Sequence, residues 1–329
     1  VEEEVEGKKV IRYKIEVPAN RPDLLCVESI AVALKVYLGG EHPNYSIQPP
    51  QLTMNVDPSV DEVRPLIICA TLRNVTFTPD SYQSFIDYQD KLHENLCRRR
   101  VLASIGTHDL NLCKPPFSYT AEKPEDIVFV PLMGGEEVNG RQLFENLHHH
   151  QQLSRYLHII EDKPVWPVVR DADRHVMSLP PIINGYRTRI TLDTKDVFIE
   201  CTALDRTRAM NAVVVLCCAF SLYSQTPFTI EQVNVVKNGV TEVTPVFDTI
   251  DFQCTLDYIK SMTSVEDLTV EKVSELLSKM SLKVKAEADG NAMTVTVPPT
   301  RTDILHQCDI AEDVAIAYGY NRIFKEKRK

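Results

Sequence analysis

The sequence has little that would mark a membrane protein, a metalloprotein or a phosphate-binding protein. No apolar run approaches the roughly 18 residues that a transmembrane helix needs. The nine cysteines form no C-x-x-C pair, and the run from His148 to His150 has no Cys or carboxylate at ligand spacing, so we expect no metal site. No glycine-rich phosphate loop is present. In composition the 329-residue chain is typical of a globular protein, with 43% hydrophobic and 25% charged residues.

The chain also has too little positive charge for a broad nucleic-acid surface, since its formal net charge is −10. Two local basic stretches, "CRRR" ending at Arg100 and "KEKRK" at the C-terminal end, are typical of a helix C-terminus and a solvated tail. Most cysteines stand in apolar runs, which indicates reduced, buried thiols in a cytosolic protein. The first residues have neither an initiator Met nor the apolar core of a signal peptide, so we expect a piece of a longer protein.

What the chain does contain is an internal repeat. Residues 17–39 align with residues 297–319 at a constant offset of 280, with eight of 23 positions identical. Each copy predicts a strand, a turn in which Arg stands two residues before a helix-capping Asp, and a helix that ends at glycine. The strands are expected at 13–17 and 293–297, the turn pairs are Arg21–Asp23 and Arg301–Asp303, and the glycines are Gly39 and Gly319. For each turn pair we favour a local Arg–Asp brace over direct ligand binding.

A long insert separates the copies. Its first part, residues 48–65, is proline-rich and predicts a linker. Strand and helix patterns then alternate, with a hairpin expected over 186–205 and another around Asn238–Gly239. Asp205 is expected to cap a helix through Phe220 that is apolar nearly all round and therefore central.

The fold class expected from this order is α+β and multidomain, with an α/β domain inserted between two similar small strand–helix modules. The first module is predicted to be discontinuous, made of residues 1–45 plus about 226–248. The inserted domain covers 60–225, and the second small α/β module covers 249–329.

Polar clusters beside apolar strands supply the candidate functional residues of the insert: Gly106 to Asp109, Ser178, and Glu200 to Thr202. Glu200 and Thr202 share one face of a strand, because side chains alternate with period two. They either line a small-molecule pocket, or Glu200 lies in water at an edge and Thr202 merely precedes the helix cap. His108 is either a general base or a loop histidine with satisfied hydrogen bonds. A Ser-His-Asp triad is poorly supported, since no Gly-x-Ser-x-Gly elbow is present.

Six blocks of the chain resemble, in order, the β subunit of phenylalanyl-tRNA synthetase of the archaeal and eukaryotic type. They are "KIEVPANRPDLLCVESIAVAL", "ASIGTHDL", "YLHIIEDKPVWPVV", "SLPPIING", "VFIECTALD" and "VPPTRTDILHQCDIAEDVAIAYGYNRI". The resemblance spans essentially the whole chain. It implies that the insert is an editing domain and that the second module has the DNA-binding-like fold of that family.

The resemblance further implies hydrolysis of tyrosine mischarged on the phenylalanine tRNA. It assigns five editing-pocket positions: Glu200, Thr202, Ser178, His108 and Val169. Glu200 is the candidate acceptor for the tyrosine hydroxyl, at a position where archaeal relatives carry Asp. In "ECTALD", Ala203–Leu204 replaces the Gly-Thr common in the family. No side chain is assigned as catalytic.

The implied partners are the synthetase α subunit, in a heterotetramer, and the phenylalanine tRNA, with no membrane and no DNA. The chain is expected in the cytoplasm, not to aminoacylate alone, and to need no cofactor, ATP and Mg being expected only for the full enzyme. The alternative is a non-catalytic scaffold that docks tRNA and the α subunit and has a degenerate editing pocket. A free-standing hydrolase is disfavoured, because it would not need both flanking modules.

Overall fold

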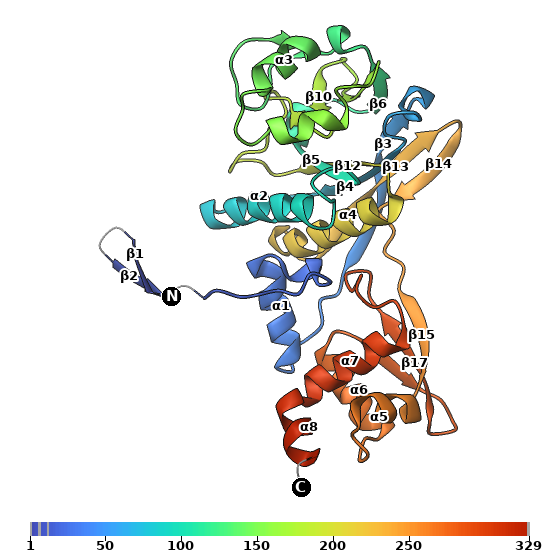
Figure 1. The fold of residues 1–329 in the computed structure, drawn as a ribbon. Coiled ribbons are helices and arrows are strands. Elements are labelled where there is room, and N and C mark those ends of the chain that lie inside the picture. The colour runs from blue at the N-terminus through green and yellow to red at the C-terminus, as the bar shows by residue number, and fades with distance from the viewer. Residues whose placement is uncertain (1, 6–7, 12, 328–329) are drawn as a thin grey trace.

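The computed structural model describes residues 2–5, 8–11 and 13–327 and confirms an α+β, multidomain fold (Figure 1). Its helices are α1 (Val27–Tyr37), α2 (Pro79–Glu94), α3 (Gly140–Leu147), α4 (Arg206–Phe220), α5 (Leu256–Thr263), α6 (Val270–Lys279), α7 (Gln307–Tyr318) and α8 (Tyr320–Lys327). Its longer strands are β3 (Ser46–Val56), β4 (Leu66–Leu72), β5 (Ala103–Asp109), β6 (Phe117–Glu122), β9 (Trp166–Arg170), β12 (Val197–Ala203), β13 (Thr229–Lys237), β15 (Ile250–Thr255) and β17 (Ala292–Val297). The other strands, of two to five residues, are β1 (Glu2–Val5), β2 (Lys8–Ile11), β7 (Val128–Phe129), β8 (Val138–Asn139), β10 (Val176–Leu179), β11 (Ile183–Asn184), β14 (Val240–Thr244) and β16 (Lys283–Ala286).

One large sheet organises the upper part of the molecule in Figure 1, in the order β11-β10-β9-β6-β3-β13-β4-β12-β5, with β14 added to β13. α4 is buried along most of its length and, with α2, covers one face of β4, β12 and β5. Asp205 caps α4 as expected, because its carboxylate accepts from the Arg208 amide at 3.0 Å. The β13–β14 hairpin, predicted to complete the first module, is hydrogen-bonded into this sheet, and the domain boundaries stay a prediction.

The sheet curls until strands near its two ends meet. Asn184 on β11 donates to the carbonyl of Thr107 on β5 at 3.3 Å, and Ser178 on β10 donates to Glu200 on β12 at 2.8 Å. The inner, concave face holds an apolar core that includes Phe117 and Phe198, whose ring centroids are 4.4 Å apart. We call the line where β10 and β11 meet β5 and β12 the seam.

The second module forms a separate body with its own core. Its three-stranded sheet has the order β15-β17-β16, and α5, α6 and α7 cover it. Met293, Val295 and Val297 of β17 alternate into this core, which confirms the strand predicted at 293–297. Strand β15 and helix α8 were not expected from the sequence.

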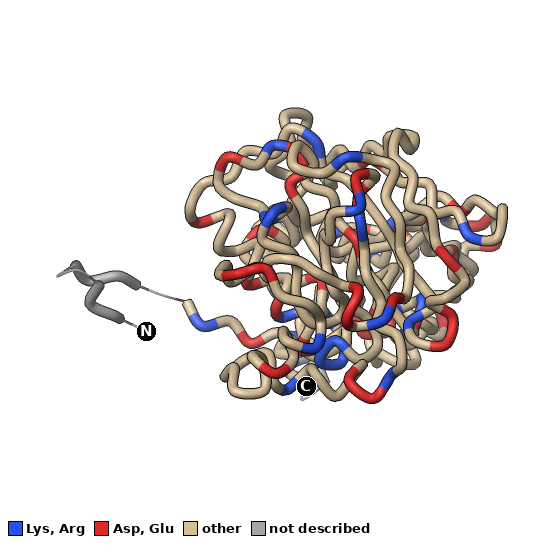
Figure 2. The backbone as a smooth tube through the Cα atoms, turned by 90° about the horizontal axis from the view of Figure 1, so that it is seen from above, with Lys and Arg blue, Asp and Glu red and all other residues tan. Residues whose placement is uncertain are grey.

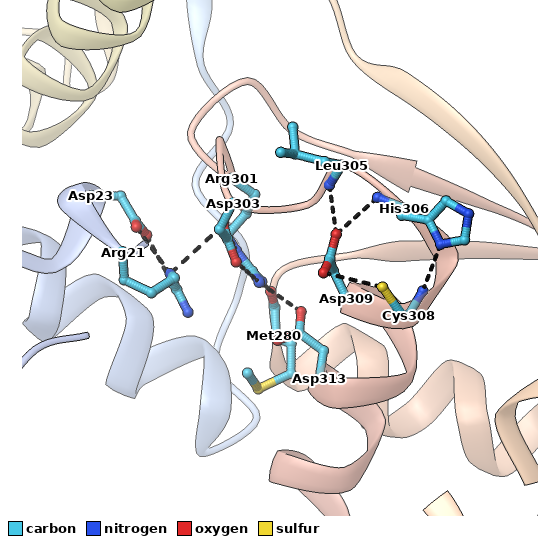
Figure 3. A network of polar contacts seen from close by, with 10 residues as sticks. All are labelled: Arg21, Asp23, Met280, Arg301, Asp303, Leu305, His306, Cys308, Asp309 and Asp313. Carbon is cyan, nitrogen blue, oxygen red and sulfur yellow. Dashed lines mark hydrogen bonds and ion pairs between the residues drawn. The ribbon is translucent and has the colours of Figure 1, made fainter. Parts of the chain in front are cut away.

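The Arg–Asp braces of the repeat are confirmed in both copies (Figure 3). Arg21 donates twice to Asp23 at 2.9 and 2.7 Å, and Arg301 donates twice to Asp303 at 2.9 and 2.8 Å. The prediction that these aspartates cap the helices is wrong, because each carboxylate is already bound by its arginine. α1 begins after Cys26 instead, and α7 begins after His306, whose ring nitrogen accepts from the Cys308 amide.

The two copies also contact one another. Arg21 Nε lies 3.9 Å from Asp303 Oδ1 of the other copy (Figure 3). Arg301 is buried and also pairs with Asp313 at 2.7 Å and donates to the Met280 carbonyl at 2.7 Å. The turn of the second copy is therefore the more enclosed of the two.

A linker, a strand and a hairpin arm that the sequence predicts are absent from the described residues. Residues 48–65 are no linker, because Leu52, Met54 and Val56 alternate into the inner core and β3 pairs along β13. Residues 13–17 form no strand, and the side chains of Tyr13 and Ile15 are exposed. The first arm of the hairpin expected over 186–205 is irregular. Only the second arm forms a strand, β12.

Acidic and basic residues are interspersed along the backbone (Figure 2). Among the helices of the described residues, none has the length and apolar character that crossing a membrane requires.

Candidate functional site

Three of the five predicted pocket residues meet at the seam. Glu200 stands in the middle of β12, and its Oε1 accepts a hydrogen bond of 2.8 Å from Ser178 Oγ on β10. His108 on β5 places its Nε2 3.8 Å from the same oxygen, while its Nδ1 lies 2.9 Å from the Thr188 hydroxyl. These side chains come from strands that are far apart in the sheet order, so the curl of the sheet brings them together.

The cluster is enclosed. The exposed fraction is 1% for Glu200, 1% for Ser178 and 0% for His108. Within the part of the chain that the structure describes, Glu200 Oε2 and His108 Nε2 have no hydrogen-bond partner. Buried polar atoms are normally paired, so these two unpaired atoms are available for hydrogen bonds to water or to a polar group of a ligand. The alternative that Glu200 lies in water at a sheet edge is wrong.

A glycine makes room for this carboxylate. Gly106 on β5 is directly opposite Glu200 on β12. A Cβ on Gly106 would lie 2.2 Å from Glu200 Oε1 and 3.2 Å from Asn184 Oδ1. The sequence predicted Gly106 only as part of the cluster from Gly106 to Asp109, and it did not predict Asn184. A glycine inside a predicted buried strand was the signal that could have identified Gly106.

Thr202 shares the face of Glu200, as predicted, but its hydroxyl belongs to another cluster. Arg64 donates to Thr202 Oγ1 and to the Thr202 carbonyl, each at 2.9 Å. The same guanidinium donates to the carbonyls of Arg100 and Val101, each at 3.0 Å. Burial lowers the pKa of Arg64 below its usual value. Arg64 was missed, because it stands in the stretch that the sequence predicted to be a linker.

Arg64 thereby supports an unusual turn. Arg98, Arg99 and Arg100 have φ angles of 51°, 53° and 65°, in the left-handed region that costs most residues energy. Arg100 also points inward, since it donates to the Ile182 carbonyl at 2.9 Å and its guanidinium lies 4.4 Å from the Tyr156 ring centroid. The "CRRR" stretch is thus a structural turn beyond the end of α2, and the prediction of a helix C-terminus there is wrong.

Val169, the fifth predicted position, is a buried residue of β9 in the inner core. It pairs across the strands with Ser178 of β10 and with Tyr119 of β6, so it lies on the same side of the sheet as Ser178. Val169 is therefore an apolar neighbour of the seam.

The thiols beside the cluster are unsuited to nucleophilic attack. Cys69 on β4 is directly opposite Glu200, and burial together with the Glu200 charge raises the pKa of its thiol. Burial likewise raises the pKa of Cys201, which faces α4. Both stay protonated, whereas a cysteine nucleophile needs its thiolate. Neither thiol is therefore suited to act as a nucleophile, and the polar side chains of the seam are suited to binding and orienting a polar group.

Two cavities lie close to these features. One of about 320 Å³ is lined by Arg64, Val101 and Leu204, among other residues, and so borders the Thr202 cluster. Another of about 330 Å³ lies between the two repeat copies and is lined in part by Arg21 and Arg301. Neither is lined by Glu200, Ser178 or His108.

Comparisons with known proteins place family models along the chain. Residues 1–40 match the Phe-tRNA synthetase beta subunit B1 domain, residues 53–215 match the B3/4 domain, and residues 252–320 match the tRNA synthetase B5 domain.

Curated relatives match nearly the whole chain. It is 46% identical over 332 residues to the cytoplasmic phenylalanine–tRNA ligase beta subunit of Arabidopsis thaliana, covering 98% of this chain and 55% of that protein. It is 42% identical over 319 residues to the phenylalanine–tRNA ligase beta subunit of Homo sapiens, covering 95% of this chain and 54% of that protein. The chain thus spans about half the length of these relatives.

A solved structure has the same fold. An N-terminal fragment of the phenylalanyl-tRNA synthetase beta subunit from Pyrococcus horikoshii matches with a TM-score of 0.85 and 34% identity. The match covers 92% of this chain and 85% of that fragment.

Proposed function

Because this chain belongs to the family of phenylalanine–tRNA ligase β subunits, we propose that its inserted domain proofreads phenylalanine tRNA by hydrolysing mischarged tyrosine. One observation supports the proposal most: Glu200 is held at the seam by Ser178 with its second carboxylate oxygen unpaired. An ionised carboxylate is an acceptor only, so it fits the donor hydroxyl that distinguishes tyrosine from phenylalanine.

The physical need for such a site is clear. An apolar pocket rejects a substrate that merely adds a hydroxyl by only about 10²-fold, whereas a site built to hydrogen-bond that hydroxyl discriminates by about 10⁴–10⁵. Phenylalanine in the editing site would leave the buried Glu200 oxygen unpaired, and tyrosine would satisfy it. The site therefore selects the product that the synthetic pocket fails to reject.

The reaction is hydrolysis of an ester. Water attacks the carbonyl carbon of the tyrosyl ester, the bond from that carbon to the ribose oxygen breaks, and a proton passes to the leaving ribose oxygen. The products are free tyrosine and uncharged tRNA. The side chains at the seam contribute by orienting the ester and the water, and no side chain is assigned as general base.

The enclosure of the cluster favours a second candidate. With exposed fractions of 0–1%, the seam residues fill the space between β5, β10 and β12. A scaffold with a degenerate pocket that docks tRNA and an α subunit would have this appearance. Ala203 and Leu204 replace a Gly-Thr pair common in the family; Ala203 is the last residue of β12 and Leu204 follows it.

We propose the following partners, compartment and cofactors for the chain. The chain acts within a heterotetramer with the α subunit, in the cytoplasm, on phenylalanine tRNA. It does not aminoacylate alone and needs no cofactor of its own, and ATP and Mg serve the full enzyme.

The test is deacylation of tyrosyl- and phenylalanyl-tRNA, both on the phenylalanine tRNA, by the full ligase that contains this chain. Proofreading predicts selective loss of tyrosine. Glu200→Ala should lower the preference for tyrosine at least about 100-fold, because the hydroxyl loses its acceptor. Thr202→Ala serves as a second variant at the neighbouring cluster. Deacylation no faster than the uncatalysed ester would leave the scaffold as the better reading.

A further inference from the structure

We propose that Gly106 is a positioning residue of the editing site, matched to Glu200. Because Gly106 on β5 has no side chain, the Glu200 carboxylate on β12 can occupy the position in which Ser178 binds it. This inference rests on the proposed editing function and adds a residue that acts through Glu200 rather than on the substrate.

The backbone does not require glycine at this position. Gly106 lies inside the regular strand β5, whose seven residues are all buried. Its φ angle is not positive, so another residue could adopt the same backbone conformation. Glycine in a strand interior weakens the strand, so its presence points to a close approach by another group. Here the approaching group is the Glu200 carboxylate, which would lie 2.2 Å from a Cβ on Gly106, with its carboxyl carbon at 2.9 Å.

Both distances are shorter than real Cβ contacts, so a methyl group on Gly106 would displace the carboxylate. Displacement moves Oε1, the atom that accepts from Ser178 at 2.8 Å. Asn184 Oδ1 lies 3.2 Å from the same Cβ point, so a methyl group there would crowd this side chain as well. Because Glu200 is 1% exposed, the displaced carboxylate would have to move within the buried cluster, and its unpaired Oε2 would lose its orientation along with Oε1.

The geometry suggests a compensating change. Glu200→Asp removes one methylene from β12, and Gly106→Ala adds one carbon on β5 directly opposite. Together they move a carbon from one strand to its neighbour and nearly conserve the volume of the cluster. Each change alone leaves either a clash or a gap, whereas the double variant restores close packing around a shorter carboxylate.

The experiment measures kcat and KM for deacylation of tyrosyl-tRNA by the full ligase with Gly106→Ala, Glu200→Asp, and both. A displacement of about 1 Å at a reacting site can lower a rate about 100-fold. We therefore expect Gly106→Ala to lower kcat/KM for deacylation of tyrosyl-tRNA by about 100-fold. The double variant should regain at least about tenfold over Gly106→Ala. Ser104→Ala, a buried polar residue two positions earlier on β5, is the matched control and should stay within about threefold of the wild type.

Two results would overturn the proposal: Gly106→Ala within about threefold of the wild type, or a double variant no better than Gly106→Ala. If the wild-type ligase does not hydrolyse tyrosyl-tRNA, the editing function fails instead. The pairing of the two residues is then decided by urea unfolding of the same variants, followed through the single tryptophan, Trp166. A double variant that unfolds at a lower urea concentration than both single variants would refute the matched pair itself.

Discussion

Replacing Arg64 with Met should destabilise the inserted domain by about 3 kcal/mol. The Arg64 side chain is buried, and its guanidinium makes four hydrogen bonds, to the Thr202 hydroxyl and to the carbonyls of Thr202, Arg100 and Val101. The structure describes no carboxylate within ion-pair distance of it among residues 13–327. Its role is therefore to satisfy oxygen atoms.

The magnitude follows from two opposing contributions. Hydrogen bonds that involve a charged group contribute about 1.5–3 kcal/mol each, so four of them contribute roughly 6–12 kcal/mol. Burying an ion costs several kcal/mol after relaxation, and removing the guanidinium recovers that cost. Met fills most of the volume but leaves three carbonyls and the strained turn at Arg98 to Arg100 without support. The balance is a net loss of about 3 kcal/mol, near the cost of breaking a buried ion pair.

The assay is urea unfolding followed by the fluorescence of Trp166. This residue is the only tryptophan of the chain and is fully buried on β9, so its signal reports the inserted domain and not the second module. Arg155→Met is the matched control, because Arg155 is about half exposed and its pair with Glu94 contributes about 0–1 kcal/mol. An Arg64→Met variant within 1 kcal/mol of the wild type would refute the reasoning that these oxygens depend on the guanidinium.

Two further predictions concern pH. Burial lowers the pKa of His93 to about 4. Between pH 6.5 and 4 the unfolded chain therefore binds a proton on His93 that the folded chain does not. The free energy of unfolding should fall by up to about 3 kcal/mol as the pH is lowered from 6.5 to 4. His93→Gln should flatten this slope in Trp166 fluorescence, and an unchanged slope would contradict the assignment. Burial raises the pKa of Asp313 to about 6. Between pH 4 and 6 the folded second module therefore holds a proton on Asp313 that the unfolded chain has lost. The free energy of unfolding of this module should fall by up to about 3 kcal/mol as the pH rises from 4 to 6. Asp313→Asn should remove this fall in hydrogen-exchange protection of residues 252–320, corrected for intrinsic rates; a fall that persists would show that another group titrates.

Local patterns predicted the elements whose burial follows from periodicity. The apolar α4 with its Asp205 cap, the alternating β17 and the hairpin turn at Asn238–Gly239 all appear where the sequence indicates them. The error at 48–65 has a physical cause: prolines at the start of β3 outweighed the alternation of Leu52, Met54 and Val56. The strand expected at 13–17 has the right alternation, but the structure describes no strand paired with it.

At the candidate site, too, local patterns predicted some features and missed those that depend on distant contacts. Period two placed Glu200 and Thr202 on one face, which the structure confirms. It could not separate their environments, because the contact of Thr202 with Arg64 spans 138 positions and that of Glu200 with Ser178 depends on the curl of the whole sheet. The roles of the five residues stay predictions.

The parallel pairing of β3 with β13 has a consequence for synthesis of the chain. These neighbours in the middle of the sheet are separated by more than 170 residues, and β13 also joins β4 on its other side. On a ribosome that adds about 5–20 residues per second, β3 waits on the order of ten seconds for its partner to be translated. Until then β3 and β4 expose unpaired edges, so the nascent insert depends on whatever shields them during that interval.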